Sequence, residues 1–349
     1  MKTSQTIIQA KRIKLGIDVH ADSYRVVRQI DDSTPQPAQK FTPLGFLLWA
    51  KKQLGQAEEV YSCYEAGPLG YGLHRALEAM GIHNIVVRPQ NWDELNRGVK
   101  TDQVDALALV QRLDRYVQGN RRSLAIVRVP TPAQELARDQ SRQREQLLAH
   151  RLRFEAQGRS LLLFHGVRTH GRWWQEDQWK NLCQQLPAAL IELLTVTRNL
   201  LLAVHAQTEA ATERLEAVAT PQPRGVGALT SQVLERESFD WHRFKNRRQV
   251  ASLTGLCPGV RGSGNKLHNG PITKHGNRRL RTALIELAWR CIRFQPQYPP
   301  LQKGRKVLAN PKTTGGAKQK AIVAVGRPLA IDLWRLRTGR NTAEKLGLQ

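Results

Sequence analysis

Near the N-terminus, apolar and polar residues alternate with a period of two, and the apolar positions are Ile13, Leu15, Ile17 and Val19. This alternation resumes after a short polar turn and predicts two β-strands within residues 12–30. The next segments switch between strand-like and helix-like patterns, with strands expected at residues 59–64 and 82–87 and helices at residues 41–54, 69–80 and from residue 102 onward. Strands that alternate with helices are typical of an α/β domain, which we expect over residues 11–125.

Residues 133–216 have a different pattern, in which apolar residues recur at helical intervals among Gln, Arg and Glu. Long helices are expected, interrupted near residues 166–174, in a helical linker domain over residues 126–219. The heptads are too irregular to fix a register, so a hairpin-like coiled coil and an ordinary helical bundle both stay open. Three tryptophans are interpreted as core residues in preference to stacking platforms for unpaired bases: Trp173, Trp174 and Trp179.

A turn-rich break at residues 220–227 begins the third segment, and we expect the last domain over residues 220–349. A glycine-rich stretch leads into a helix expected at about residues 277–294, and a final helix is expected at residues 321–336. The basic residues 303–320 between these helices are expected to form turns. The fold class is therefore α/β for the first domain and all-α for the two domains that follow.

The charge is distributed unevenly along the chain. Lys and Arg number 54 against 29 Asp and Glu, which gives a net charge of +25. Residues 241–349 hold 23 basic and 3 acidic side chains, so most of the excess lies in the last third of the chain. Phosphate-backbone binding requires such concentrated Lys and Arg, because each neutralised phosphate releases counterions. The sequence predicts a polyanionic partner, with a basic tail that contacts nothing specific as the alternative.

Composition and cysteine spacing exclude several classes of protein. The hydrophobic fraction of 40%, with 26 glycines in addition, is enough for a globular core and excludes general disorder. The four cysteines form no C-x-x-C pair, which excludes a disulfide scaffold and a zinc ribbon and fits a reducing cytoplasm. No apolar run approaches the roughly 20 residues of a membrane span, so no membrane partner is expected.

Four separated carboxylates in the first domain are candidates for a metal site: Asp18, Glu65, Asp102 and Asp105. Asp18 lies on a strand among apolar residues, Glu65 ends a strand, and the other two lie three apart on one helix face. Mg²⁺ prefers oxygen ligands, and two-metal phosphodiester chemistry draws carboxylates from several elements. The alternatives are helix capping by the last two and a turn role for Glu65. Spacing alone leaves both interpretations open, although an unpaired buried Asp18 is costly.

Ser263 lies between two glycines, which let the backbone approach a ligand closely and leave the hydroxyl uncrowded. Six basic residues surround it in the sequence: Arg261, Lys266, Lys274, Arg278, Arg279 and Arg281. A serine among cationic groups is suited to attack a phosphodiester, because those groups stabilise the developing charge. The alternative is a flexible Gly-Ser loop that holds a phosphate through its backbone amides, and the residues alone favour it.

Several of these motifs resemble those of a known family. The sequences GIDV at 16–19, YEAGPLGY at 64–71 and KTDQVDALA at 100–108 resemble the N-terminal half of the DEDD insertion-sequence transposases. LTGLCPGVRGSGNK at 253–266 and GPITKHGNRRLRTAL at 270–284 resemble their C-terminal transposase domain. The resemblance covers nearly the whole chain in the order of the family.

This resemblance implies an RNase H-like fold related to the RuvC resolvases, followed by a coiled coil and a helical transposase domain. The acidic tetrad that binds Mg²⁺ would then be Asp18, Glu65, Asp102 and Asp105, and Ser263 would form a covalent link to a DNA phosphate. It further implies donor and target DNA as substrates and a structured non-coding bridge RNA as guide. The active site would combine the tetrad of one subunit with the serine of another in a homo-oligomer, a dimer or a dimer of dimers. The expected location is the bacterial cytoplasm, at the nucleoid.

The sequence therefore supports the hypothesis of an RNA-guided, Mg²⁺-dependent DNA recombinase that excises and inserts its own element. In this hypothesis Ser263 attacks the scissile phosphate, and Arg261 and Lys266 screen the developing charge. One rival is a Mg²⁺-dependent, RuvC-like Holliday-junction resolvase that uses water as nucleophile. The other is a nucleic-acid-binding protein without enzymatic activity, whose carboxylates are structural caps.

Overall fold

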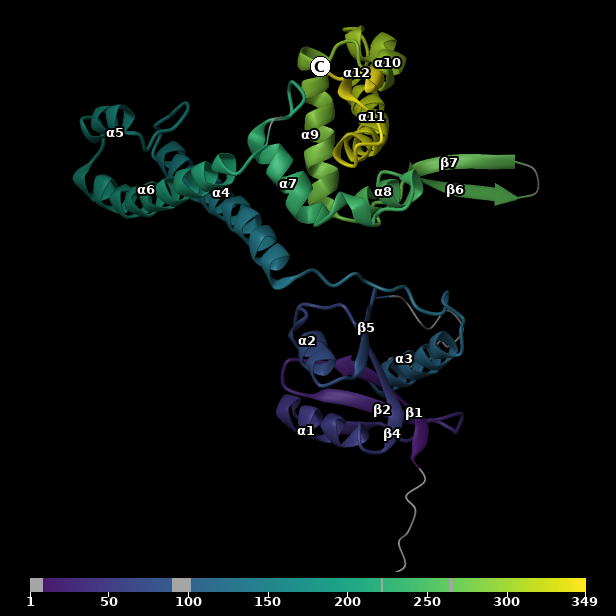
Figure 1. Cartoon of the computed structure of the whole chain (residues 1–349). Coiled ribbons are helices and arrows are strands. Elements are labelled where there is room, and N and C mark those ends of the chain that lie inside the picture. The colour runs from purple at the N-terminus through teal and green to yellow at the C-terminus, as the bar shows by residue number, and fades with distance from the viewer. Residues whose placement is uncertain (1–8, 90–101, 221, 264–265) are drawn as a thin grey trace, which may run out of the picture. The chain divides into compact units, whose positions relative to one another are not determined.

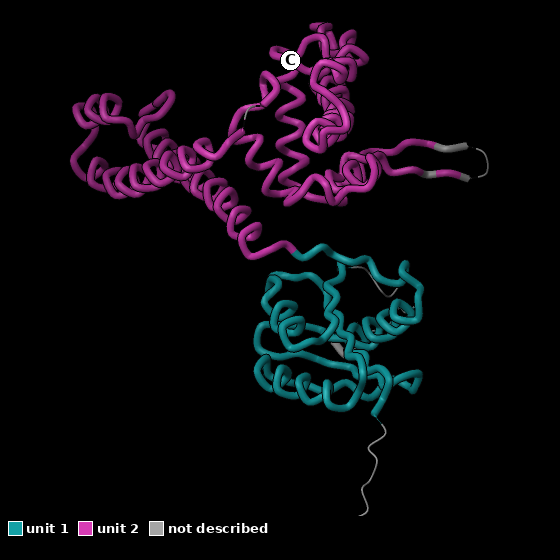
Figure 2. The backbone as a smooth tube through the Cα atoms, viewed as in Figure 1, with its two compact units in different colours: residues 1–129 teal, residues 130–349 magenta. Residues whose placement is uncertain are grey.

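The computed structural model describes residues 9–89, 102–220, 222–263 and 266–349. The chain divides into two compact units, Met1–Val129 and Pro130–Gln349 (Figure 2). The division after Val129 lies close to residue 125, the expected end of the α/β domain. The second expected boundary, at residue 219, stays a prediction.

The first unit is built on a five-stranded mixed sheet in the order β3-β2-β1-β4-β5. Its strands are β1 (Ala10–Val19), β2 (Tyr24–Ile30), β3 (Gln39–Phe41), β4 (Ala57–Glu65) and β5 (His83–Val87). The first three pair antiparallel, and β1, β4 and β5 pair parallel. The strands expected from alternating apolar residues are confirmed, whereas the three-residue β3 was not expected because it lies in a polar segment.

Helices cover both faces of this sheet. They are α1 (Pro43–Gln53), α2 (Gly72–Ala79) and α3 (Asp102–Val117). On one face Leu15 of β1 belongs to a buried cluster with Phe46 of α1 and Leu77 of α2, and on the other Cys63 of β4 belongs to a cluster with Leu109 of α3. Figure 1 shows α1 and α2 on one side of the sheet and α3 on the other. The expected α/β class is thus confirmed, with three layers.

The second unit begins with two long helices joined through a short one: α4 (Pro132–Phe164), α5 (Glu176–Cys183) and α6 (Ala188–Ala217). A capping box fixes the start of α4, since Thr131 accepts a hydrogen bond from the backbone of Gln134 and the Gln134 side chain accepts one in return. Helices α4 and α6 pack against each other as a helical hairpin. Trp173 and Trp174 are almost fully buried in its hydrophobic cluster, to which Trp179 also belongs. The interpretation of these tryptophans as core residues is confirmed.

Helix α6 corrects one expectation. It is long and apolar enough in composition to cross a bilayer, whereas the apolar runs of the sequence predicted no such segment. Arg198 in its middle donates hydrogen bonds to the backbone carbonyl of Trp174 and to the carboxylate of Glu176, and Leu194 and Leu201 are buried in the hairpin core. This is the packing of a helix within a folded protein unit.

The rest of the second unit is a helical body with one β-hairpin (Figure 1). Its elements are α7 (Ala228–Ser238), η1 (Trp241–Arg243), α8 (Arg247–Thr254), β6 (Pro258–Ser263), β7 (Lys266–Ile272), α9 (Arg278–Phe294), α10 (Pro299–Ala309), α11 (Gly315–Arg337) and α12 (Ala343–Leu346). Helices α9 and α11 pack at its centre through Leu284, Leu287 and Leu329, which are each about 1% exposed. The helix expected at residues 277–294 is confirmed.

Two expectations for this body are wrong. The last domain is not all-α, because it contains the β6–β7 hairpin. Residues 303–320 also do not form turns throughout, since most of them lie in α10 and α11. Proline at the first turn starts α10, and the side chain of Thr314 caps α11, so the local turn signals mark helix starts. Only residues 310–314 connect the two helices without helical structure.

A buried carboxylate links three helices of the second unit. Glu237 of α7 accepts hydrogen bonds from Arg142 of α4 at 2.8 and 2.9 Å and from Asn277 at 2.7 Å, and Asn277 caps α9. Burial by itself raises the pKa of Glu237, but these hydrogen bonds outweigh it and the pKa is lowered overall. The group therefore contributes stability above its ordinary pKa, and this contribution is lost as pH falls through the lowered pKa.

We expect Glu237→Gln to lower the free energy of unfolding by about 1–3 kcal/mol at neutral pH, because Arg142, whose side chain is 29% exposed, loses its charge partner. The difference from the wild type should shrink as the pH is lowered, since the wild type then loses the same ion pair. Urea unfolding at several pH values measures this, with Glu192→Gln on the exposed face of α6 as the control. If the difference in the free energy of unfolding between the variant and the wild type did not change with pH, the stabilising ion pair of Glu237 with Arg142 would be contradicted.

Candidate active site

Two of the expected carboxylates end neighbouring parallel strands. Ile17 of β1 lies opposite Tyr64 of β4, so the following residues, Asp18 and Glu65, occupy the next register position at the C-terminal ends of both strands. Side chains at one register position of parallel neighbours point to the same face of a sheet. The topology thus brings together two residues that lie 47 positions apart in the sequence.

Helix α3 covers the face to which these two carboxylates belong. The Sγ of Cys63 donates a hydrogen bond to the backbone carbonyl of Leu109 in α3 at 3.5 Å. Burial raises the pKa of the Cys63 thiol, which keeps it protonated and able to donate. Because alternate residues of a strand share a face, Glu65, two residues after Cys63, lies on the α3 side.

Gly16 allows the same helix to lie very close to β1. A Cβ at this position would lie 2.3 Å from the carbonyl oxygen of Ala106 and 2.5 Å from the backbone nitrogen of Val110. Both are backbone atoms and cannot rotate away, so only glycine fits here. Asp18, two residues further along the strand, therefore also lies on the α3 side.

We expect Gly16→Ala to destabilise the first unit by about 1–3 kcal/mol and to displace α3, because the added methyl overlaps the helix backbone. Hydrogen exchange of the α3 amides in the full chain measures this, and exchange should become faster. Gly72→Ala is the matched control, since a Cβ at Gly72 has no neighbour within 4 Å. If the α3 amides were equally protected from hydrogen exchange in both variants, the close approach of α3 to Gly16 would be contradicted.

The direction of α3 places its first turn toward Asp18. The buried Lys14, near the middle of β1, forms an ion pair with Asp114, near the end of α3, so the helix runs antiparallel to the strand. Asp105 lies in the first turn and is half-buried. Asp102 is the first residue of the helix, and its side chain lies outside the described residues.

The donor set of this edge suits a hard divalent cation. The side chain of Asp18 is 20% exposed, and its Oδ2 lies 3.1 Å from Nε2 of His20. Carboxylate oxygens from two strands and one helix are ligands that Mg²⁺ prefers. Among the described side chains, no three His, Cys, Asp or Glu residues lie close enough together to hold a metal ion. The side chain of Asp102, one of the four expected ligands, is not described. The metal site stays a prediction.

The expected nucleophile lies at the end of a strand of a β-hairpin. Ser263 is the last residue of β6 and pairs with Lys266, the first residue of β7. Figure 1 shows the two strands extending from the helices of the second unit. The side chains of Ser263, Lys266 and Arg261 lie outside the described residues. Glycines obscured the strand signal, because Gly259 and Gly270 lie where the two backbones approach closely next to a β-bulge.

The other expected basic residues lie where the hairpin joins the helical body. Lys274, with φ of 57°, and Arg278 are exposed to solvent. Arg281 donates hydrogen bonds to the backbone carbonyl of Lys274 at 3.1 Å and to that of Thr254 at 3.3 Å, so it braces the base of the hairpin. Arg279 of α9 pairs with Glu145 of α4. Two of these side chains thus have structural partners, and binding of nucleic acid by the set stays a prediction.

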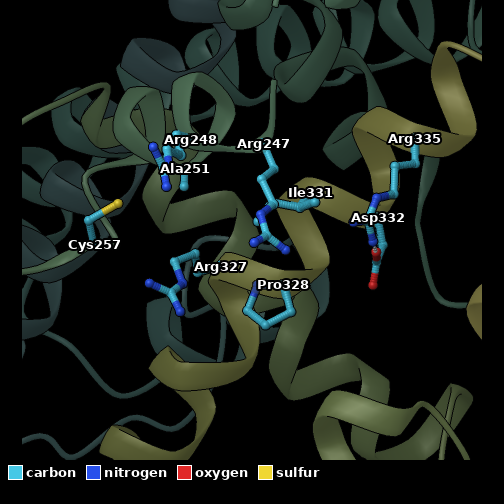
Figure 3. A pocket seen from close by; sticks show the side chains of 9 residues that line it. All are labelled: Arg247, Arg248, Ala251, Cys257, Arg327, Pro328, Ile331, Asp332 and Arg335. Carbon is cyan, nitrogen blue, oxygen red and sulfur yellow. Dashed lines mark hydrogen bonds and ion pairs between the residues drawn. The ribbon is translucent and has the colours of Figure 1, made fainter. Parts of the chain in front are cut away.

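The structure also brings together basic residues that no sequence motif indicated. Arg247 and Arg248 of α8 and Arg327 of α11 line one pocket, together with Arg335 (Figure 3). The Arg-Arg pair is visible in the sequence, but its proximity to a residue 79 positions later depends on the packing of α8 against α11.

Comparison with known proteins shows similarity to transposases. The sequence profile of the "Transposase IS116/IS110/IS902 family" matches residues 222–301. A transposase of Sinorhizobium fredii, y4rJ, is 32% identical over 317 residues, which cover 82% of this chain and 79% of the relative. The transposase for insertion sequence element IS1533 of Leptospira borgpetersenii is 25% identical over 80% of this chain and 85% of its own. The transposase for IS1111A of Coxiella burnetii is 27% identical over 77% and 75%.

Proposed function

Because the chain belongs to the IS116/IS110/IS902 family of transposases, which are enzymes that recombine DNA, we propose that it excises and inserts its own element through a Mg²⁺-assisted serine–DNA intermediate. The observation that carries the proposal is that Asp18 and Glu65 occupy one register position at the C-terminal ends of neighbouring strands, on the sheet face that α3 covers. Structural caps alone do not require carboxylates of two neighbouring strands to share one register position and one face.

Four carboxylates would hold the metal: Asp18, Glu65, Asp102 and Asp105. Bound Mg²⁺ supplies electrostatic stabilisation of the scissile phosphate and of the charge that develops on it. We propose an RNase H-like, RuvC-related role for the first unit, supported by the sequence motifs and by the mixed sheet with a helix over its acidic edge.

Ser263 would supply the nucleophile. Its Oγ forms a bond to phosphorus as the bond between phosphorus and one sugar oxygen breaks, and the serine proton is balanced by the proton that the leaving hydroxyl gains. One phosphodiester is exchanged for another, so a second strand can displace the serine without ATP. The place of Ser263 at the end of a hairpin that extends from its unit supports this role, because a DNA strand can reach it. Arg261 and Lys266, its neighbours in the hairpin, would screen the charge.

We propose donor and target DNA as substrates, a bridge RNA as guide, and a homo-oligomer in which the carboxylates of one copy act with the serine of another. The motif resemblance supports these partners, and the net charge of +20 over residues 241–349 supports a nucleic acid.

The test is a reaction of the full chain with DNA that carries the ends of its element, the flanking transcript and Mg²⁺. The proposal predicts strand joining and a protein–DNA adduct that resists denaturation. Cleavage without an adduct would favour a water-using resolvase and would contradict the serine step.

A further inference from the structure

A second basic site lies at the base of the hairpin that carries Ser263. It is a pocket of about 490 Å³ between α8 and α11, and Cys257, which immediately precedes β6, lies on its wall. Figure 3 shows the side chains of Arg247 and Arg248 from α8 and of Arg327 from α11 around the same hollow. All three side chains are exposed to solvent.

The charge inside this pocket is unbalanced. Its one carboxylate, Asp332, is buried, accepts a hydrogen bond from Tyr298 at 2.7 Å, and pairs with Arg335 at 2.9 Å. Burial and the nearby Asp332 raise the pKa of Tyr298, which therefore remains a donor to this carboxylate. Asp332 is thus already neutralised by a pocket arginine and cannot also serve as the counterion of the other three.

The other three arginines have no acidic partner within the described parts of the chain. Among those residues, the guanidinium groups of Arg247, Arg248 and Arg327 form no ion pair and no hydrogen bond, and Arg248 donates only its backbone N–H, to the side chain of Asn246. Arg247 and Arg248 also occupy the first turn of α8, where the helix dipole favours negative and disfavours positive charge. Three cations that converge from two elements without a counterion are arranged for an anion with several acceptor oxygens.

We propose that this pocket binds the phosphate backbone of duplex DNA and holds it beside the hairpin. Guanidinium groups match phosphate oxygens in a bidentate geometry, and their exposure suits a polymer backbone that passes over the pocket. The six residues of β6 span on the order of 20 Å, which corresponds to about six base pairs of duplex. A duplex fixed here would therefore lie within reach of the hairpin end. This inference rests on the DNA substrate of the proposed function and does not depend on the serine or metal chemistry.

The test is the salt dependence of duplex binding by the full chain without Mg²⁺, so that no cleavage interferes. The variant Arg247→Gln/Arg248→Gln/Arg327→Gln should bind a labelled duplex at least about tenfold more weakly at 0.1 M salt. Its plot of log K against log salt should be shallower by about 0.9 for each phosphate that the variant no longer neutralises, a total of about 1–3. Arg→Lys at the same positions should restore most of the slope, because each charge is kept.

The matched control removes three equally exposed charges from the first unit, Lys40→Gln/Lys51→Gln/Lys52→Gln. It changes the net charge equally and should leave the slope within about 0.3 of the wild type. Equal slopes for the pocket variant and the control overturn the proposal. A loss of affinity for single-stranded RNA with unchanged duplex binding also overturns it. Circular dichroism confirms that each variant is folded before binding is measured.

Discussion

Asp18→Asn is expected to lower the rate of DNA strand cleavage by about a thousandfold, since the variant keeps the shape of the side chain and loses the charge that would hold Mg²⁺. Metal-assisted stabilisation of a phosphoryl transition state is worth several kcal/mol, and about 4 kcal/mol corresponds to a thousandfold. Glu65→Gln should have a similar effect, because Glu65 shares the register position of Asp18 on β4. Single-turnover cleavage of element-end DNA measures both.

Glu58→Gln is the matched control for these variants. Glu58 is exposed and lies on the same strand as Glu65, toward its opposite end. It should leave cleavage unchanged. Removal of Mg²⁺ with a chelator should stop the wild type, and added Mg²⁺ should restore it. Binding of Mn²⁺, measured by electron paramagnetic resonance, should weaken in the Asp18 and Glu65 variants and stay unchanged in Glu58→Gln. Wild-type cleavage by Asp18→Asn would contradict the carboxylate assignment.

Ser263→Ala is expected to abolish the covalent protein–DNA adduct completely and to change DNA affinity by no more than about threefold. A methyl group has no oxygen with which to attack phosphorus, whereas the backbone of the hairpin stays the same. Denaturing gel electrophoresis of labelled DNA measures the adduct, and anisotropy measures affinity. Ser252→Ala, an exposed serine of α8 in the same unit, is the control and should form the adduct normally.

A different result would identify a different nucleophile. If Ser263→Ala still cuts DNA at the wild-type rate and neither protein forms an adduct, water is the nucleophile and the serine only contacts phosphate. If Ser263→Ala still forms the adduct, another side chain attacks.

The first unit was largely predictable because its pattern is local. Period-two alternation around Leu15 and Ile17 identified the central strand, and a carboxylate among those apolar residues identified Asp18 as unusual. The sequence did not determine that Gly16 admits the backbone of α3 or that Cys63 reaches Leu109, because both contacts depend on how the helix returns to the sheet.

The second unit was less predictable for two physical reasons. Glycines at 259, 262 and 270 weaken the strand pattern, so the β6–β7 hairpin resembled a loop. Basic and glycine residues at 303–320 resembled turns, although tertiary packing of α10 on α11 holds most of them in helices. The pocket of Arg247, Arg248 and Arg327 depends on the packing of α8 against α11, which no local pattern specifies.

The most direct test of the serine–DNA intermediate is to locate the adduct on the wild-type chain. The adduct formed with element-end DNA and Mg²⁺ would be digested with nuclease and trypsin and analysed by mass spectrometry. Cleavage after Arg261 and Lys266 releases residues 262–266, with Ser263 as the only hydroxyl side chain in the peptide. A serine nucleophile leaves a nucleotide on this peptide, attached through Ser263. A nucleotide attached to any other residue, or cut DNA with no modified peptide, would contradict it.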